Sequence, residues 1–254
     1  VSAQIAAQYE QGGALEQAIP YYQRAAAVAA AVYANADAIA LLNRGLALLA
    51  QMPPGARRDA RELALLLALA PLYRVTKGWT SPETERVVSR SLVLSEKVGT
   101  VYQRAQALYS AHSFYVVSAQ LNKVESEYPE MNRLFQQAGE KSPLFALIMS
   151  AGAKLHIGRL VEARTLFERM LAVRDDEQVR NVQMSHGVNY LAQGYAWNAH
   201  GLWCLGYPQA AYQSATLAME VARQFAQPFN QALTVTYLAM LQEWLADKAT
   251  FRHY

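Results

Sequence analysis

The sequence contains five histidines and one cysteine, residue types that often supply metal ligands, bases and nucleophiles. No H-E-x-x-H occurs and no two histidines lie four residues apart, so the spacing does not predict a zinc site on a helix. We interpret His112 as a core histidine, because it falls where two helices of a predicted hairpin come close. Cys204 follows Trp203 in an apolar segment without a basic neighbour, which favours a small buried side chain over a nucleophile.

Acidic residues gather at Asp175-Asp176-Glu177 and at Glu125, Glu127 and Glu130. We expect the first group to lie in a solvated loop, because a calcium site would need more oxygen ligands. The phosphate-binding G-x-x-x-x-G-K-[ST] and the G-x-S-x-G of hydrolases do not occur in the sequence. The sequence therefore predicts no catalytic residue, no metal site and no cofactor.

Composition limits the classes of function that remain. Of 254 residues, 53% are hydrophobic and 17% charged, which argues against disorder. The net charge is +3 without any run of five Lys or Arg residues, so we expect no contact with nucleic acid. The longest apolar stretches, 25–34 and 63–73, are about half as long as a membrane-spanning helix. With a single cysteine, no internal disulfide can form, and we expect a cytoplasmic protein.

Residues of high helix propensity fill most of the sequence, with apolar residues at three- and four-residue steps. Short breaks that carry Gly or Pro separate these segments and typically end one helix and begin the next. The breaks lie at Gly12-Gly13, 52–55, 78–82, Gly99, Ser142-Pro143, Gly158, 206–208 and Gln227-Pro228. We predict an all-α chain of about twelve helices in which sequential neighbours pack antiparallel.

Four predicted turns, at Gly13, Ala119, Gly158 and Gly206, share one pattern of small and large residues. At +5, +9 and +12 from each turn stand Ala18, Tyr22 and Ala25; Ala163, Phe167 and Met170; Ala211, Ala215 and Ala218; and, less closely, Val124, Tyr128 and Met131. Seven residues before the turns stand Ala6, His112, Ala151 and Ala199. A small residue on each helix lets two backbones approach closely, and the large residue fills the gap to the next hairpin. The pattern predicts an α-solenoid of antiparallel helix pairs.

This pattern resembles the tetratricopeptide repeat (TPR), whose second helix carries small-x3-aromatic-x2-small. The match is degenerate, since the turns lie 39 residues apart from 119 to 158 and 48 apart from 158 to 206, against a regular 34. Ser2, Leu147 and Tyr195 stand where the repeat has its first-helix Trp. Between residues 30 and 100 we propose one pair centred on Ala38, Leu42 and Gly45 and another on Val87, Ser91 and Leu94, with the register left open. The resemblance implies a single TPR-like superhelix over 1–254, which we expect to be a fragment of a larger protein.

Seven short segments carry a narrower resemblance. They are AQYEQGG at 7–13, EQAIPYYQRA at 16–25, NADAIA at 35–40, RGLALL at 44–49, ELAL at 62–65, TKGW at 76–79 and SPE at 81–83. They are similar to the C-terminal helical sensor region of bacterial STAND-type signalling ATPases, which are fused to nucleotide cyclase or transcription-regulator domains. The resemblance implies a sensor arm that holds or releases an ATPase core. Gly139-Glu140-Lys141-Ser142 lacks the spacing of a P-loop, so any ATPase or cyclase activity would lie outside these residues.

In a TPR array the first helix of each pair lines the concave surface, and the resemblance carries that role to twelve positions here. They are Gln106, Tyr109, Ser113 and Val116; Phe145, Ile148, Gly152 and His156; and Gln193, Ala196, His200 and Trp203. Their aromatic, amide and imidazole groups would suit a peptide or a small aromatic ligand. Aromatic residues at helical spacing equally fit a packed core. We interpret Trp79, Trp197 and Trp244 as packing residues outside this face.

Three functions remain open. A regulatory solenoid would bind a peptide, a partner domain or a small effector on its concave face and act through unequal affinity for two states. A purely structural scaffold would pack on a neighbouring NTPase or cyclase domain and recognise nothing else. An enzyme is the least favoured, because no grouping of residues meets the geometric requirements of catalysis.

Overall fold

The computed structural model describes residues 1–139, 144–172, 189–224 and 228–245. Over these residues the chain is all-α, with twelve helices and no strand. Within residues 1–118, and among the described helices from residue 119 onward, each helix packs on the next, as in an α-solenoid of antiparallel pairs. The predicted fold class is therefore confirmed. The chain divides into two compact units, Val1–Ser118 and Ala119–Tyr254, and each is described by itself.

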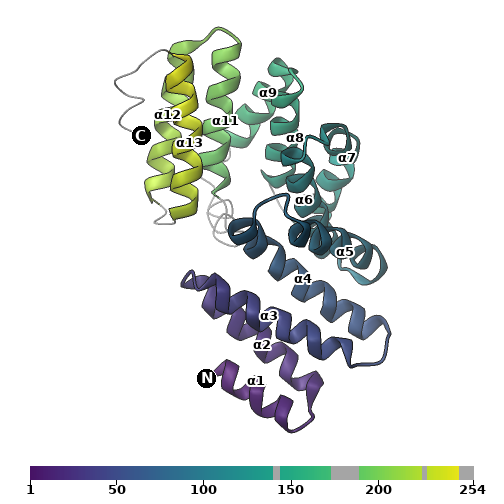
Figure 1. Ribbon diagram of the computed structural model, residues 1–254. Coiled ribbons are helices and arrows are strands. Elements are labelled where there is room, and N and C mark those ends of the chain that lie inside the picture. Colours follow the sequence, from purple (N-terminus) through teal and green to yellow (C-terminus); the bar gives the residue numbers. More distant parts are fainter. Residues whose placement is uncertain (140–143, 173–188, 225–227, 246–254) are drawn as a thin grey trace. The chain divides into compact units, whose positions relative to one another are not determined.

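The N-terminal unit consists of six helices, drawn from purple to dark teal in Figure 1. They are α1 (Ser2–Gln11), α2 (Leu15–Ala31), α3 (Asn35–Ala50), α4 (Ala56–Lys77), α5 (Pro82–Val98) and α6 (Val101–Val117). Each helix packs on the next, and α4 also contacts α6. The longest helix, α4, thus joins the first three helices to the last two.

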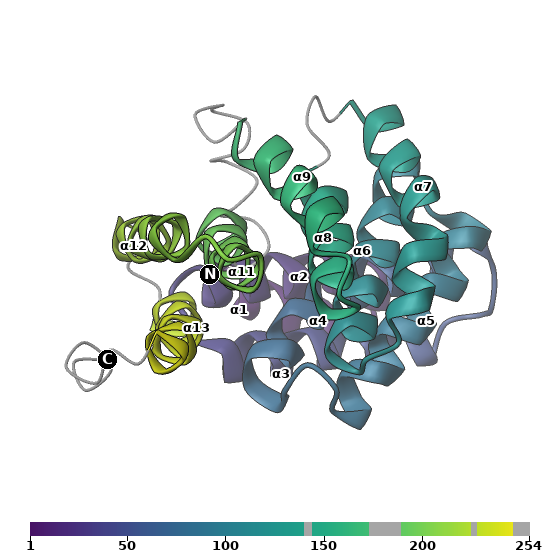
Figure 2. The same ribbon diagram turned by 90° about the horizontal axis from the view of Figure 1, so that it is seen from above.

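The C-terminal unit contains α7 (Leu121–Gln137), α8 (Leu144–His156), α9 (Leu160–Leu171), α11 (Tyr190–Cys204), α12 (Pro208–Gln224) and α13 (Pro228–Trp244). Helix α11 contacts α8, α9, α12 and α13. Figure 2 looks along α11, α12 and α13, which form a group of three mutually contacting helices. Because α11 is surrounded in this way, every residue from Tyr190 to Leu202 is buried.

The four turns that define the repeat all have the left-handed backbone that ends a helix abruptly. The φ angles are 74° at Gly13, 84° at Gly158, 84° at Gly206 and 59° at Ala119. After each of the three glycines, the next backbone N–H donates to the carbonyl five residues earlier, for example from Ala14 to Tyr9 at 2.8 Å. These bonds satisfy carbonyl groups that the helix end leaves unpaired.

The repeat register predicted from the sequence is also confirmed by burial. Every residue at the −7, +5, +9 and +12 positions of the four turns is buried, except Tyr128, which is half-buried. In the stretch where the register was open, Ala38, Leu42 and Gly45 lie on the buried face of α3. Val87, Ser91 and Leu94 lie on the buried face of α5.

Polar contacts fix where helices begin and how they meet. The Ser81 hydroxyl accepts a hydrogen bond from the Thr84 backbone N–H at 3.2 Å, just before Pro82 opens α5. Glu10 of α1 accepts a hydrogen bond of 2.6 Å from the Tyr22 hydroxyl of α2 and pairs with Arg44 of α3. Glu10 therefore ties three consecutive helices together at one edge.

We predict that Ala18→Leu destabilises the protein by about 1–3 kcal/mol, because Ala18 is wholly buried and leucine adds three carbons to a packed interior. Ala27→Leu on the same helix is the matched control, since Ala27 is exposed, and its effect should stay within about 0.5 kcal/mol. Urea unfolding followed by circular dichroism measures both. Equal stability of the two variants would show that the small-residue position does not limit helix approach.

Candidate functional site

The predicted binding residues of the N-terminal unit lie on α6. Tyr109 and Ser113 are buried, and Gln106 and Val116 are half-buried. The Ser113 hydroxyl donates to the backbone carbonyl of Tyr109 at 3.0 Å, so this group is engaged within its own helix. The Tyr109 ring faces the guanidinium of Arg74 on α4, with 5.7 Å from the guanidinium carbon to the ring centroid.

The other eight predicted positions lie on α8 and α11 of the C-terminal unit. Ile148 and Gly152 of α8 are buried, whereas His156 is exposed at the end of that helix. On α11, Gln193, Ala196 and His200 are buried and Trp203 is half-buried. The side chain of Phe145 lies outside the described residues. All twelve positions stay predicted binding residues, and the described ones range from buried to exposed.

Three of the eight join a continuous series of rings that we call the aromatic cluster: His156, Trp197, His200, Trp203, Tyr237 and Trp244. Ring-centroid distances link neighbouring members, from His156 to Trp197 at 5.8 Å, Trp197 to Tyr237 at 6.2 Å and Tyr237 to His200 at 5.4 Å. The series continues from His200 to Trp244 at 4.7 Å and from Trp244 to Trp203 at 5.2 Å. These separations are those of attractive aromatic pairs.

Three helices of the C-terminal unit position the aromatic cluster. Trp197, His200 and Trp203 follow one another at three-residue steps and so share one side of α11. Tyr237 and Trp244 lie seven residues apart on α13, again on one side of a helix, and His156 ends α8. The TPR register predicts three members from the sequence, whereas Trp197 and Trp244 are interpreted there as packing residues outside the concave face. The seven-residue spacing of Tyr237 and Trp244 is the one sequence feature that could have placed these two rings on the same side of α13.

The outer members of the aromatic cluster reach solvent while its inner members do not. Trp197 is 4% exposed and His200 is 7% exposed, whereas Trp244 is 38% exposed. His156 is also exposed, and Trp203 and Tyr237 are half-buried. The inner rings therefore fix the outer rings in place, and a partly open apolar surface results.

Gly152 sets the distance between α8 and the Trp197 ring. A Cβ atom at position 152 would lie 2.2 Å from Cζ3 of Trp197, far inside van der Waals contact. The indole thus lies directly against the backbone of α8 at a place where only glycine fits. The TPR register assigns Gly152 to the concave face, and in the structure Gly152 packs against Trp197.

His200 is held in the aromatic cluster by its ring nitrogen Nε2, which lies 2.8 Å from the backbone carbonyl of Tyr237. Burial lowers the pKa of His200, because the charged form loses its hydration. The contact with the Tyr237 carbonyl opposes this shift by favouring the protonated ring, and the nearby His156 adds to the lowering. At neutral pH we therefore expect a neutral imidazole that donates from Nε2 to the carbonyl.

Several buried polar atoms of α11 and α13 have no hydrogen-bond partner among the described residues. They are Nε1 of Trp197, Oε1 of Gln193, Oδ1 of Asn198 and Oε1 of Gln242. An unsatisfied buried donor or acceptor typically costs about 1–3 kcal/mol. Trp197 is both the most buried ring of the aromatic cluster and a donor with an unused N–H.

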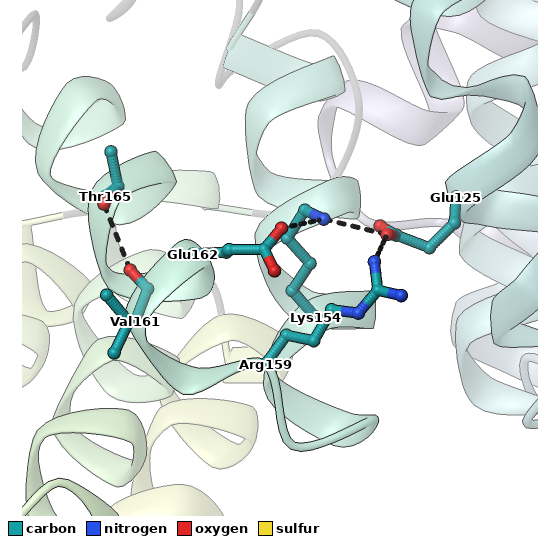
Figure 3. A network of polar contacts seen from close by, with 6 residues as sticks. All are labelled: Glu125, Lys154, Arg159, Val161, Glu162 and Thr165. Carbon is teal, nitrogen blue, oxygen red and sulfur yellow. Dashed lines mark hydrogen bonds and ion pairs between the residues drawn. The ribbon is translucent and has the colours of Figure 1, made fainter.

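A charged network stabilises the helix that ends at His156 (Figure 3). Lys154 of α8 donates to Glu125 of α7 and to Glu162 of α9, at 2.8 Å each, and Arg159 reaches Glu125 at 3.2 Å. Burial opposes the charge of Lys154, but the hydrogen bonds to both glutamates outweigh it and raise its pKa. The hydrogen bond from Lys154 lowers the pKa of Glu162. The network joins α7, α8 and α9 two residues before His156.

His156 and His200 both belong to the aromatic cluster, whereas His112 and Cys204 lie outside it. Within the described ranges, no group of three or more His, Cys, Asp or Glu side chains could hold a metal ion. Cys204 is exposed, so its interpretation as a buried hydrophobe is wrong: as the last residue of α11 it passes beyond the packed part of the helix. Asp175, Asp176, Glu177, His186 and His253 lie outside the described residues.

The fold and the aromatic cluster define a helical-repeat protein whose most distinctive surface is a partly exposed row of rings. Comparison with protein-family models and with curated proteins finds no match to this sequence. None of the described helices combines the length and the apolar character that crossing a bilayer requires.

We predict that Gly152→Ala destabilises the protein by about 1–3 kcal/mol, because the buried Trp197 ring must move to admit a methyl group. Gly201→Ala on α11 is the matched control. Its Cβ would meet Leu155 Cδ1 at 3.4 Å, an ordinary contact, and alanine favours the helix by up to about 1 kcal/mol. Urea unfolding monitored by tryptophan fluorescence should rank Gly201→Ala above Gly152→Ala. The reverse order would contradict the described packing of Trp197.

We also predict a pH dependence that originates at His200. Because its folded pKa is lowered, the neutral ring contributes stability above the unfolded pKa of about 6.5, and this contribution is lost as pH falls through the folded pKa. The free energy of unfolding of the wild-type protein should thus fall more steeply below about pH 6.5 than that of His200→Gln. His156→Gln, which removes an exposed imidazole, should keep most of the wild-type slope. Parallel slopes for the wild-type protein and His200→Gln would refute this assignment.

Proposed function

We propose that this chain is a non-catalytic interaction and sensing module that binds a peptide or partner domain through the aromatic cluster. The supporting observation is a row of contacting rings from α8, α11 and α13 whose outer members remain open to solvent. Aromatic residues dominate the energetic centres of protein interfaces. Exposed apolar surface of this kind marks interaction sites in soluble proteins.

Pre-organisation supports the same proposal. A binding surface loses affinity when its side chains must be ordered on association, at about 0.5–1.5 kcal/mol for each flexible side chain. Trp203 and Trp244 contact each other, and Trp244 also packs on buried His200, so little of this cost remains. The surface suits a ligand that presents an apolar or aromatic side chain, such as a hydrophobic peptide or a small aromatic effector.

The resemblance to bacterial signalling ATPases suggests how binding would matter. We propose that the chain is the regulatory arm of such an ATPase, or of a transcriptional regulator, in the cytoplasm. It would contact other domains of the same protein and change that contact when a ligand occupies the aromatic cluster. A ligand can shift such a switch only by its unequal affinity for the two states.

A structural scaffold is the second candidate function. Among the predicted concave-face residues, Tyr109, Ile148 and Ala196 are almost wholly buried and are engaged in packing. A helical array whose large side chains pack inward would support a neighbouring NTPase or cyclase domain without recognising a separate ligand.

Selection from a displayed library of random peptides separates the two functions. We expect selected peptides to bind the wild-type chain and to lose at least about thirtyfold in affinity on Trp203→Ala combined with Trp244→Ala, since a hot-spot residue is worth about 2 kcal/mol or more. Tyr212→Ala removes a ring of α12 that is also exposed, and should bind as the wild type does. Fluorescence anisotropy of labelled peptides measures the affinities.

Two outcomes of that selection would count against the proposed site. Peptides that bind the double variant with wild-type affinity would place binding elsewhere on the chain. A selection that enriches no peptide above background, on a chain shown by circular dichroism to be folded, would favour the scaffold.

A further inference from the structure

The N-terminal unit contains a buried arginine that has no charged partner among the described residues. Arg74 of α4 is 4% exposed, and its guanidinium carries five N–H donors and no acceptor. The guanidinium carbon lies 5.3 Å from the ring centroid of Trp79 and 5.7 Å from that of Tyr109. Its Nη1 is buried without a hydrogen-bond acceptor, and no carboxylate among the described residues forms an ion pair with it.

Three other basic residues of this unit have carboxylate partners, unlike Arg74. Lys97 lies 2.5 Å from Asp59, and Arg90 lies 2.7 Å from Glu62. Arg61, which is partly buried, donates to the Glu16 carbonyl at 2.9 Å and contacts its carboxylate at 3.0 Å. These groups are all more exposed than Arg74, yet each has a carboxylate partner.

The two rings satisfy only part of what a buried guanidinium requires. A cation–π contact stabilises a desolvated guanidinium, but by less than the cost of leaving a buried charge uncompensated. Ring faces also do not accept the in-plane N–H bonds of the guanidinium as an oxygen does. Among the described residues, Arg74 therefore lacks a hydrogen-bond acceptor at Nη1, and an anionic acceptor would also balance its charge.

We propose that Arg74 anchors a binding site for a small oxyanion, a carboxylate or a phosphate group, between α4, the turn at 78–81 and α6. The anion would accept from the guanidinium edge, while Trp79 and Tyr109 hold the guanidinium in place. Residues 74–82 carry two basic and no acidic side chains and α6 has no acidic residue, while Glu83 and Glu85 open α5 beyond the turn. Basic groups therefore predominate on the elements that bound the site.

The turn that carries Trp79 is fixed by its own hydrogen bonds. The Thr84 hydroxyl donates to the carbonyl of Gly78 at 2.8 Å, and the Gly78 N–H donates to the carbonyl of Tyr73 at 3.2 Å. The φ of 104° at Gly78 lies in the region that favours glycine, and it lets the chain leave α4 sharply. Trp79 is half-buried, so the rim of the site reaches solvent at this ring.

This inference does not depend on the aromatic cluster, which lies in the other unit. Peptide binding that survives Trp203→Ala combined with Trp244→Ala would count against the aromatic cluster and leave the oxyanion site unaffected. An absent oxyanion response in the wild-type chain would likewise say nothing against the aromatic cluster. The two proposals fail separately.

The test titrates the full chain with sodium phosphate and, separately, with sodium acetate, against sodium chloride at equal ionic strength. We expect a saturable rise in melting temperature of about 3–5 °C at ten times the dissociation constant. A response to phosphate alone assigns the site to phosphoryl groups, and a response to acetate alone assigns it to carboxylates. If neither anion exceeds chloride, the proposal is overturned.

Variants separate specific binding from the general stabilisation that excluded anions such as phosphate give. Arg74→Met should remove the saturable rise while folding as well as the wild type, since an apolar side chain of similar length replaces an unpaired buried charge. Arg74→Lys keeps the charge without the planar fork and should bind at least about tenfold more weakly. A wild-type response in Arg74→Met would overturn the proposal, and Arg74→Lys serves the same purpose if Arg74→Met does not fold.

Arg24→Met is the matched control for these variants. Arg24 belongs to the same unit, and its guanidinium carbon lies 4.4 Å from the Tyr21 ring centroid, but the side chain is exposed. We expect Arg24→Met to keep the complete response to the anion. Its loss in Arg24→Met as well would mean that overall positive charge, rather than the buried site, produces the effect.

Discussion

Close approach of helix backbones at small residues is the constraint on which the rest of this structure depends. Ala6, Ala18 and Ala38 are wholly buried on α1, α2 and α3. The same arrangement recurs in the C-terminal unit, where Ala151, Ala163, Ala199 and Ala211 are buried. At these places a larger side chain would separate two helices and would also disturb the next hairpin, because each helix pair packs on its neighbour. Gly152 is the extreme case, since a whole indole lies against the helix backbone there.

This packing determines where the aromatic cluster comes to the surface. Helix α11 contacts four other helices over most of its length, so the rings near its middle are buried. Toward its C-terminal end the cover decreases, from buried Trp197 and His200 to half-buried Trp203 and exposed Cys204. The aromatic cluster therefore runs from the core of the C-terminal unit to its surface. Such an arrangement combines rigid support with accessible rings, which is the requirement for a surface that binds without reordering itself.

Local features made most of the fold predictable. Glycine at a left-handed turn and small residues at fixed offsets are determined within one hairpin, so Gly13, Gly158 and Gly206 could be recognised from the sequence. The candidate site was only partly predictable, because its members come from helices that meet through tertiary packing. The TPR register led to His156, His200 and Trp203, but α13 follows the last matched turn and has no place in that register. Cys204 was misjudged because burial depends on where the neighbouring helices end rather than on the apolar character of its own segment.

The site at Arg74 could not be predicted from the sequence, because its parts also meet only through tertiary packing. Arg74 further shows that packing can bury a polar group without giving it a hydrogen-bond partner among the described residues. Its surroundings come from α4, the turn after α4 and α6, three pieces whose meeting no local pattern specifies. Hydrophobic burial is non-directional and tolerates many arrangements, whereas each buried polar group requires a partner at a particular point. The helices of this protein bury apolar side chains throughout their cores. The buried Nη1 of Arg74 and Nε1 of Trp197, however, have no hydrogen-bond partner among the described residues. Because a fold gains nothing by burying such groups unpaired, the unmet donors are the places where a ligand gains most by binding. Both donors lie beside aromatic rings that reach solvent, and we propose that the chain recognises its ligands at the surfaces these rings form.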